Sequence, residues 1–201
     1  MSGSRVVVLS REVAFEGYFQ IVRVRLRHEQ FRGGMGPEIS REVFERGQAV
    51  AVLPYDPERD EVVLVEQFRV GALDAPGEPW LIEPVAGIVE AGETPEDVAH
   101  REAREEADVE IQDLLPACEY FVSPGGATER CQVFVGRVST EGAGGIFGLE
   151  GEGEDIRAHV MKLDEAVRAI DTDPRFRTAS ALVALQWLAL NRERVRRAFG
   201  G

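Results

Sequence analysis

The stretch GIVEAGETPEDVAHREAREEADV, residues 87–109, decides the fold of this chain. It begins with a glycine-bearing loop and then changes to helical character. Thr94 is a good N-cap, Pro95 takes the first helical position, and Asp97 stands three residues after the cap. These signals predict a helix over residues 95–107.

Three carboxylates share one face of this predicted helix. Glu102, Glu105 and Glu106 stand at i, i+3 and i+4, so they lie within about one turn and repel one another. Such an acidic run is more commonly a solvated face. Here divalent cations explain the repulsion better, because Mg²⁺ prefers oxygen ligands and also binds phosphates. Arg101, four residues before Glu105, is positioned to orient these carboxylates.

The stretch resembles the Nudix box, G-x5-E-x7-R-E-U-x-E-E-x-G-U, where U is apolar. The fixed positions that match are Gly87, Glu93, Arg101, Glu102, Glu105 and Glu106, with Ala103 and Val109 at the U positions. Asp108 departs from the pattern, which has glycine there. Aspartate also adopts left-handed backbone, so we expect the helix to end normally and the acidic face to stay intact.

The remaining chain reads as strands with few, separated helices, which predicts an α/β sandwich rather than a regular βαβ array. Strands are predicted at residues 6–9, 18–27, 49–55, 61–70, 80–82, 117–122, 132–138 and 158–163, and helices at 164–170 and 178–197. Residues 139–155 form a long Gly- and Glu-rich loop, which is typical of a functional or mobile segment. The predicted domains are an antiparallel β region, 1–45, and a Nudix domain, 46–201, for which the resemblance implies an α/β/α sandwich with a mixed sheet.

A second signature, SPGG at residues 123–126, follows the box. Its Pro124 resembles the ADP-ribose pyrophosphatase subgroup of the Nudix family, although a simple Pro-Gly turn is equally consistent with these four residues. The resemblance covers nearly the whole chain, including 41–48, 66–69, 80–86, 152–160 and 184–188.

The resemblance implies roles for individual residues. Glu102 and Glu106 would be the principal metal ligands, with help from Glu105 and the Ala86 carbonyl, while Glu93 braces the loop. Glu152 is the first choice and Glu154 the second for the base that activates water, since the sequence does not tell which points inward.

For the substrate, the resemblance implies the following contacts: diphosphate held by Arg41 and Arg69, a pocket lined by Glu83 and Glu129, and adenine stacked on Tyr18 or Phe19. These residues also have purely structural interpretations: Arg69 as a charge on the strand surface, and Tyr18 and Phe19 as ordinary strand aromatics.

The implied reaction is hydrolysis of ADP-ribose to AMP and ribose 5-phosphate with about two or three Mg²⁺ ions, Mn²⁺ being the alternative metal. There are two competing hypotheses: the substrate is another nucleotide sugar such as GDP-mannose, or the protein is a non-catalytic nucleotide sensor. The resemblance also implies a homodimer in which the N-terminal strands complete the partner's active site, because a lone hairpin exposes its edges and apolar face.

Composition excludes several other classes. A net charge of −13 argues against nucleic-acid binding, and no signal peptide or span of roughly 20 apolar residues is present, so a cytoplasmic, non-membrane protein is expected. Cys118 and Cys131 are expected to be reduced core residues. The histidines lack zinc-site spacing; they are His28, His100 and His159.

Overall fold

The computed structural model describes residues 5–149, 151 and 153–200. Contacts divide the chain into two compact units, Met1–Gly47 with Phe121–Arg130, and Gln48–Tyr120 with Cys131–Gly201. The domain boundary predicted between residues 45 and 46 lies close to the first division. The sequence did not predict that Phe121–Arg130 would group with the N-terminal strands.

The first unit is an antiparallel sheet whose described strands follow the order β1-β2-β3. They are β1 (Val6–Glu16), β2 (Gln20–His28) and β3 (Ile39–Glu45). The predicted hairpin corresponds to β1 and β2, whereas β3 was not predicted. Phe44 in β3 also pairs with the Phe121–Arg130 segment, because its N–H donates to Gly126 O at 2.8 Å and its carbonyl accepts from Thr128 N at 3.0 Å.

The second unit contains a larger sheet with the described order β10-β11-β5-β4-β9-β8, to which β6 is added beside β5 and β7 beside β4. Its strands are β4 (Gln48–Asp56), β5 (Glu61–Phe68), β6 (Trp80–Glu83), β7 (Val85–Ile88), β8 (Asp113–Phe121), β9 (Arg130–Arg137), β10 (Gly145–Phe147) and β11 (Ile156–Lys162). The sheet is mixed. Most pairs are antiparallel, but β9 follows β4 in the same direction, since Arg130 N binds Gly47 O and Val138 N binds Tyr55 O.

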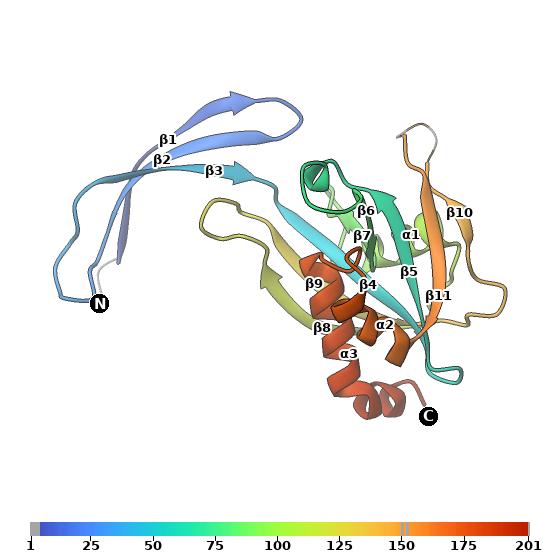
Figure 1. The fold of residues 1–201 in the computed structure, drawn as a ribbon. Coiled ribbons are helices and arrows are strands. Elements are labelled where there is room, and N and C mark those ends of the chain that lie inside the picture. Colours follow the sequence, from blue (N-terminus) through green and yellow to red (C-terminus); the bar gives the residue numbers. More distant parts are fainter. Residues whose placement is uncertain (1–4, 150, 152, 201) are drawn as a thin grey trace. The chain divides into compact units, whose positions relative to one another are not determined.

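Helices cover both faces of this sheet (Figure 1). They are α1 (Pro95–Ala107), α2 (Leu163–Thr172) and α3 (Ala179–Ala198), with a short 3-10 helix η1 (Val70–Ala72) between β5 and β6. The predicted α/β class and α/β/α layering are confirmed.

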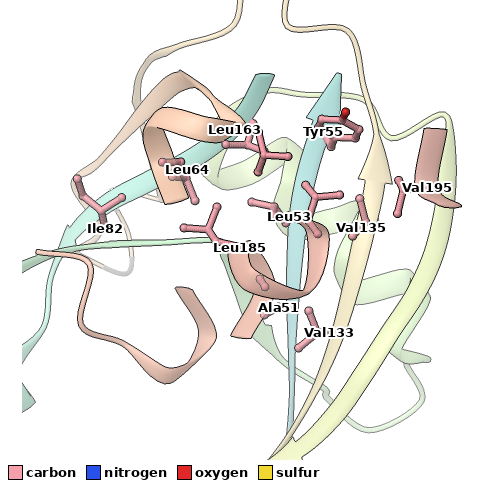
Figure 2. Packing of buried hydrophobic residues seen from close by; sticks show 14 of the residues in the cluster. Ala51, Leu53, Tyr55, Leu64, Ile82, Val133, Val135, Leu163, Leu185 and Val195 are labelled. Atoms are coloured by element: carbon pink, nitrogen blue, oxygen red, sulfur yellow. The ribbon is translucent and has the colours of Figure 1, made fainter. Parts of the chain in front are cut away.

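Alternation along the central strands explains the two layers. In β4, Leu53 and Tyr55 join the buried cluster with α2 and α3, whereas Val50 and Val52 join the cluster beneath α1. A strand sends successive side chains to opposite faces, so a continuously apolar strand is buried on both. Figure 2 shows the first cluster, in which strand side chains meet Leu163 and Leu185 from the helices. Each such buried side chain stabilises the fold by about 1.5–3 kcal/mol.

The helix α1 begins and ends as predicted. Thr94 accepts a hydrogen bond from Asp97 N, and Asp97 accepts one from Thr94 N at 3.0 Å, which completes a capping box. Asp108 has φ 50° and ψ 42°, so it adopts the left-handed backbone expected for it. Both ends of the acidic helix are therefore set by local interactions.

The two cysteines form no disulfide; Cys131 is buried and Cys118 is half-buried.

Candidate active site

Arg101 organises the acidic face of α1. Its Nε donates to Glu93 Oε1 at 3.0 Å, and its Nη1 donates to Glu102 Oε1 at 2.8 Å and to Glu105 Oε2 at 3.2 Å. One guanidinium therefore ties the preceding loop to two carboxylates of the helix. Arg101 can therefore orient these carboxylates, because its planar guanidinium group restricts the rotamers of the side chains that it binds.

Gly87 makes room for the Glu102 side chain. A Cβ on Gly87 would lie 1.9 Å from Glu102 Oε1 and 2.4 Å from Glu102 Cδ. No larger residue fits without displacing the carboxylate, since such distances are far below van der Waals contact. The glycine that opens the box thus has a steric role and not merely a conformational one.

Burial makes two of the carboxylates hard to ionise. Glu106 is only 3% exposed, and burial, reinforced by repulsion from Glu102 and Glu154, raises its pKa to about 8 despite a hydrogen bond from Ala86 and attraction to Arg69. Burial raises the pKa of Glu102 to about 7, even though Arg101 favours the charged form. A nearby cation would restore the charged form of both groups.

The backbone of Ala86 lies beside the second of these carboxylates. Its N–H donates to Glu106 Oε2 at 3.1 Å from the middle of β7. Among the residues that the structure describes, no group of three or more His, Cys, Asp or Glu side chains is arranged so that it could hold a metal ion. The carboxylates of Glu102 and Glu105 are directed instead to Arg101.

Arg69 and Glu83 form a close ion pair at the end of β5. Arg69 Nε donates to Glu83 Oε2 at 2.6 Å, and Glu83 is 7% exposed. The charge of Arg69 also opposes the rise of the Glu106 pKa, so this arginine lies near the acidic face. Both residues were predicted to contact substrate, but their pairing with each other was not.

The loop that follows β10 contacts α1 at its described first residue, Gly148. Gly148 N donates to Glu105 O at 3.3 Å, and Leu149 N donates to Glu154 Oε2 at 3.3 Å. The charge of Glu154 raises the pKa of both Glu102 and Glu106, so this residue lies near the acidic face. Glu152 lies outside the described residues.

The other predicted substrate contacts belong to the first unit, where an aromatic cluster surrounds Arg46. The ring centroids of Tyr18 and Phe19 are 4.6 Å apart, and those of Phe19 and Phe44 are 5.3 Å apart. The Arg46 guanidinium stands 4.4 Å over the Phe19 ring and donates to both carboxylate oxygens of Glu129, at 3.1 and 3.4 Å. Arg46 and Phe44 were not singled out from the sequence, because only the fold brings Glu129 to them.

Arg41 and Pro124 are placed differently. Arg41 is exposed and donates to its neighbour's carbonyl, Ser40 O. Three positions before Phe44 on an extended strand, its side chain leaves the opposite face of β3. Pro124 lies in a tight turn in which Gly126 N and Ala127 N both donate to Ser123 O. The turn contacts β3 through Phe44, so it supports the aromatic cluster.

Within the described part of the chain, no helix is long and apolar enough to cross a membrane.

Comparisons with known proteins agree with this geometry. The NUDIX domain model matches residues 45–182. ADP-ribose pyrophosphatase of Escherichia coli (strain K12) is 45% identical over 188 residues, covering 94% of this chain and 90% of that protein. The Haemophilus influenzae protein of the same name is 41% identical, covering 92% and 87%.

More distant proteins share the fold. GDP-mannose pyrophosphatase of Klebsiella pneumoniae is 33% identical over 153 residues, covering 74% of each chain. A crystal structure described as an ADP compounds hydrolase superposes with a TM-score of 0.71 at 20% identity, covering 98% of this chain and 99% of that one. The capped acidic helix, the loop that precedes it and the matches along the chain lead to one conclusion: the protein belongs to the Nudix hydrolase family.

Proposed function

We propose that the protein hydrolyses ADP-ribose at its diphosphate bond, with AMP and ribose 5-phosphate as products. The observation that carries the proposal is the buried acidic face of α1 in a chain 45% identical to an ADP-ribose pyrophosphatase over nearly its whole length. A diphosphate is anionic, and this face is acidic. Substrate binding there requires cations between the two.

The donor set fits divalent metal ions. Glu102 and Glu106 are carboxylates whose raised pKa values reflect burial without enough positive charge nearby. Glu105 and the Ala86 carbonyl would complete the ligands of about two or three Mg²⁺ ions, with Mn²⁺ as the alternative. When bound, such ions would neutralise charge on the diphosphate and lower the pKa of a bound water, which could then lose a proton and attack phosphorus.

The protein's own side chains would then bind and orient the substrate. Arg69, held by Glu83, would contact the diphosphate near Glu106, with Arg41 as a second cation. Tyr18 or Phe19 would stack on adenine, and Glu129 would accept a hydrogen bond in the same pocket. Glu152 is the first candidate for the base that takes a proton from the attacking water, and Glu154 is the second.

Two other functions remain as alternatives. GDP-mannose is the second candidate substrate, because a relative at 33% identity carries that name. A nucleotide sensor without turnover is the third, but it leaves the matched set of Glu102, Glu105 and Glu106 without a purpose.

Product analysis distinguishes these functions. Purified protein is incubated with ADP-ribose, GDP-mannose and related sugars, with Mg²⁺ or with excess chelator. We expect AMP and ribose 5-phosphate from ADP-ribose with Mg²⁺ only, and Glu106→Gln should lower kcat by about 10²-fold or more while its melting temperature stays at the wild-type level. Glu110→Gln is the matched control, since Glu110 is exposed and bonded to Arg104 away from the acidic face.

Full turnover in chelator, or retained activity in Glu106→Gln, contradicts the metal site. Faster turnover of GDP-mannose than of ADP-ribose contradicts ADP-ribose as the preferred substrate. Tight binding of ADP-ribose without products supports the sensor instead.

We also propose that the protein is a homodimer in which the N-terminal strands of one chain complete the partner's active site. The support is the exposed apolar surface of β1, where Val8, Val13 and Phe15 are 51, 55 and 61% exposed. A sheet with so few buried residues gains stability by packing against a second copy.

A further inference from the structure

Gln67 in β5 has a buried side chain whose amide nitrogen donates no hydrogen bond to any described residue. The residue is 7% exposed, and its Nε2 is enclosed but bonded to nothing in the described part of the chain. More than about nine in ten buried polar groups in native structures have a partner. A buried amide that lacks one needs an explanation, and a ligand that supplies the acceptor is one such explanation.

The strand register places Gln67 on the face of the sheet that α1 covers. Val63 and Val65 belong to the buried cluster beneath α1, and side chains alternate along the strand, so Gln67 and Arg69 leave the same face. Val65 pairs with Glu83. Gln67 therefore lies between Val65 and Arg69 on this face of β5, and diagonal to Glu83 on β6. The Arg69–Glu83 ion pair follows it at the end of the strand.

The neighbouring strand leads to the same place. Arg157 pairs with Glu66, so Ile156 of the same buried cluster flanks Gln67 from β11. Glu154 precedes Ile156 by two residues, and its charge is near enough to raise the pKa values of Glu102 and Glu106. Gln67 is thus bordered by Arg69 on its own strand and by the end of the Glu154 loop on the next.

An amide N–H can satisfy only certain groups in this setting. Its nitrogen has no lone pair available for a metal ion, so it must donate to an oxygen. In the described part of the chain no carboxylate accepts a hydrogen bond from it: Glu83 is already paired with Arg69, and Glu102 and Glu106 are the proposed metal ligands. An anionic oxygen that arrives with the substrate would satisfy this donor.

We propose that the Gln67 side-chain amide donates a hydrogen bond to a non-bridging oxygen of the bound diphosphate. Gln67 then acts beside Arg69 as a substrate-binding residue. A neutral donor suits this position, because it holds the anion without competing with cations for the carboxylates. The inference rests on the proposed function to the extent that a diphosphate binds over the acidic face.

The test compares Gln67→Met with the wild type in the full-length protein. Methionine keeps the length of the side chain but has no donor. We expect an unchanged or higher melting temperature, because an unsatisfied polar group is removed, together with a fall in kcat/KM for ADP-ribose of about 10- to 100-fold, the loss of one hydrogen bond to a charged group. Calorimetry with inorganic pyrophosphate and Mg²⁺ should give a weaker Kd by a similar factor.

Gln132→Met is the matched control. Gln132 Nε2 already donates to Cys118 O at 3.2 Å, so its loss should lower the melting temperature and leave kcat/KM and pyrophosphate binding unchanged. The two substitutions are chemically identical, and the proposal requires opposite effects on stability and function.

Wild-type kcat/KM and wild-type pyrophosphate affinity in folded Gln67→Met, each within about twofold, would overturn the proposal. If that variant does not fold, Gln67→Leu, which also lacks a donor, is measured in the same way and judged by the same limits. A wild-type protein that binds pyrophosphate through Gln67 but does not cleave ADP-ribose would overturn the proposed substrate while supporting this inference.

Discussion

At the scale of single residues, the acidic face depends on a glycine as much as on its glutamates. Gly87 lies so close to Glu102 that a methyl group would overlap the carboxylate, at 1.9 Å from Oε1. Arg101 also donates a hydrogen bond to Glu102 Oε1, at 2.8 Å. The Glu102 side chain is therefore confined to one position, as an octahedral metal site requires of its ligands.

Gly87→Ala should therefore impair metal binding without removing any ligand. The new methyl group must push Glu102 away, so we expect weaker Mg²⁺ binding by calorimetry and a fall in kcat of about 10-fold or more at fixed Mg²⁺. The control is Gly71→Ala, because a Cβ there meets no atom within 4 Å. Unchanged metal affinity in Gly87→Ala would contradict the steric role.

At the scale of elements, the β10–β11 loop brings a further carboxylate to the helix. Glu154 accepts a hydrogen bond from the backbone of Leu149, and its charge raises the pKa values of Glu102 and Glu106. A group that is coupled to the metal ligands should affect metal affinity. A base that only touches the attacking water should affect kcat alone.

We accordingly expect Glu152→Gln to lower kcat by about 10²–10⁴-fold with little change in Mg²⁺ affinity. Glu154→Gln should weaken Mg²⁺ binding and slow turnover less. Kinetics at several Mg²⁺ concentrations separate the two effects. If neither substitution slows turnover, the base lies elsewhere.

The turn between β4 and β5 contains a carboxylate that supports folding rather than chemistry. Asp56 is 5% exposed and accepts hydrogen bonds from Glu58 N, Arg59 N and both the N–H and hydroxyl of Thr140. Burial alone would raise its pKa, but these hydrogen bonds outweigh burial and lower the pKa of Asp56 below its usual value.

A lowered pKa in the folded state means that the ionised form stabilises the fold. This contribution is fully present above the unfolded pKa of about 3.9 and is lost as the pH falls from there through the lower folded value. The free energies of unfolding of the wild type and of Asp56→Asn should differ most near neutral pH and converge below about pH 4. Asp113→Asn, at an exposed site, should show little difference at either pH. A constant gap between wild type and Asp56→Asn would contradict the role of ionisation.

At the scale of the whole molecule, the predicted substrate residues are divided between two units. In the first unit, Phe19 and Glu129 contact Arg46 and Tyr18 packs against Phe19, whereas the acidic face belongs to the second unit. The proposed homodimer would join one chain's aromatic cluster to its partner's acidic face. Such a stacking contact is made in ground and transition states alike, so its loss should chiefly raise KM.

Mixing two variants with different defects tests this arrangement. Phe19→Ala chains lack the ring and Glu106→Gln chains lack the ligand, so a mixed dimer contains one site with both residues intact. After exchange of equal amounts, about half of the dimers should be mixed, so about a quarter of all sites should recover normal kcat/KM. Sedimentation should show a dimer. A fully active monomer, or exchange without recovery, would rule out the shared site.

The sequence alone determined the helix α1, its cap at Thr94 and its left-handed end at Asp108, because interactions within a few residues specify them. It also placed most strands of the large sheet, whose apolar runs are long. The strands β3, β7 and β10 were missed for different reasons. The strand β3 is mostly exposed and has no long apolar run, β10 is three residues long, and β7 is a four-residue strand that pairs with β4, which is distant in sequence. Tertiary structure likewise decided that Arg46 would meet Glu129, that Arg69 would pair with Glu83, and that Gln67 Nε2 would be enclosed with no acceptor among the described residues, because each of these depends on which segments the folded sheets bring together.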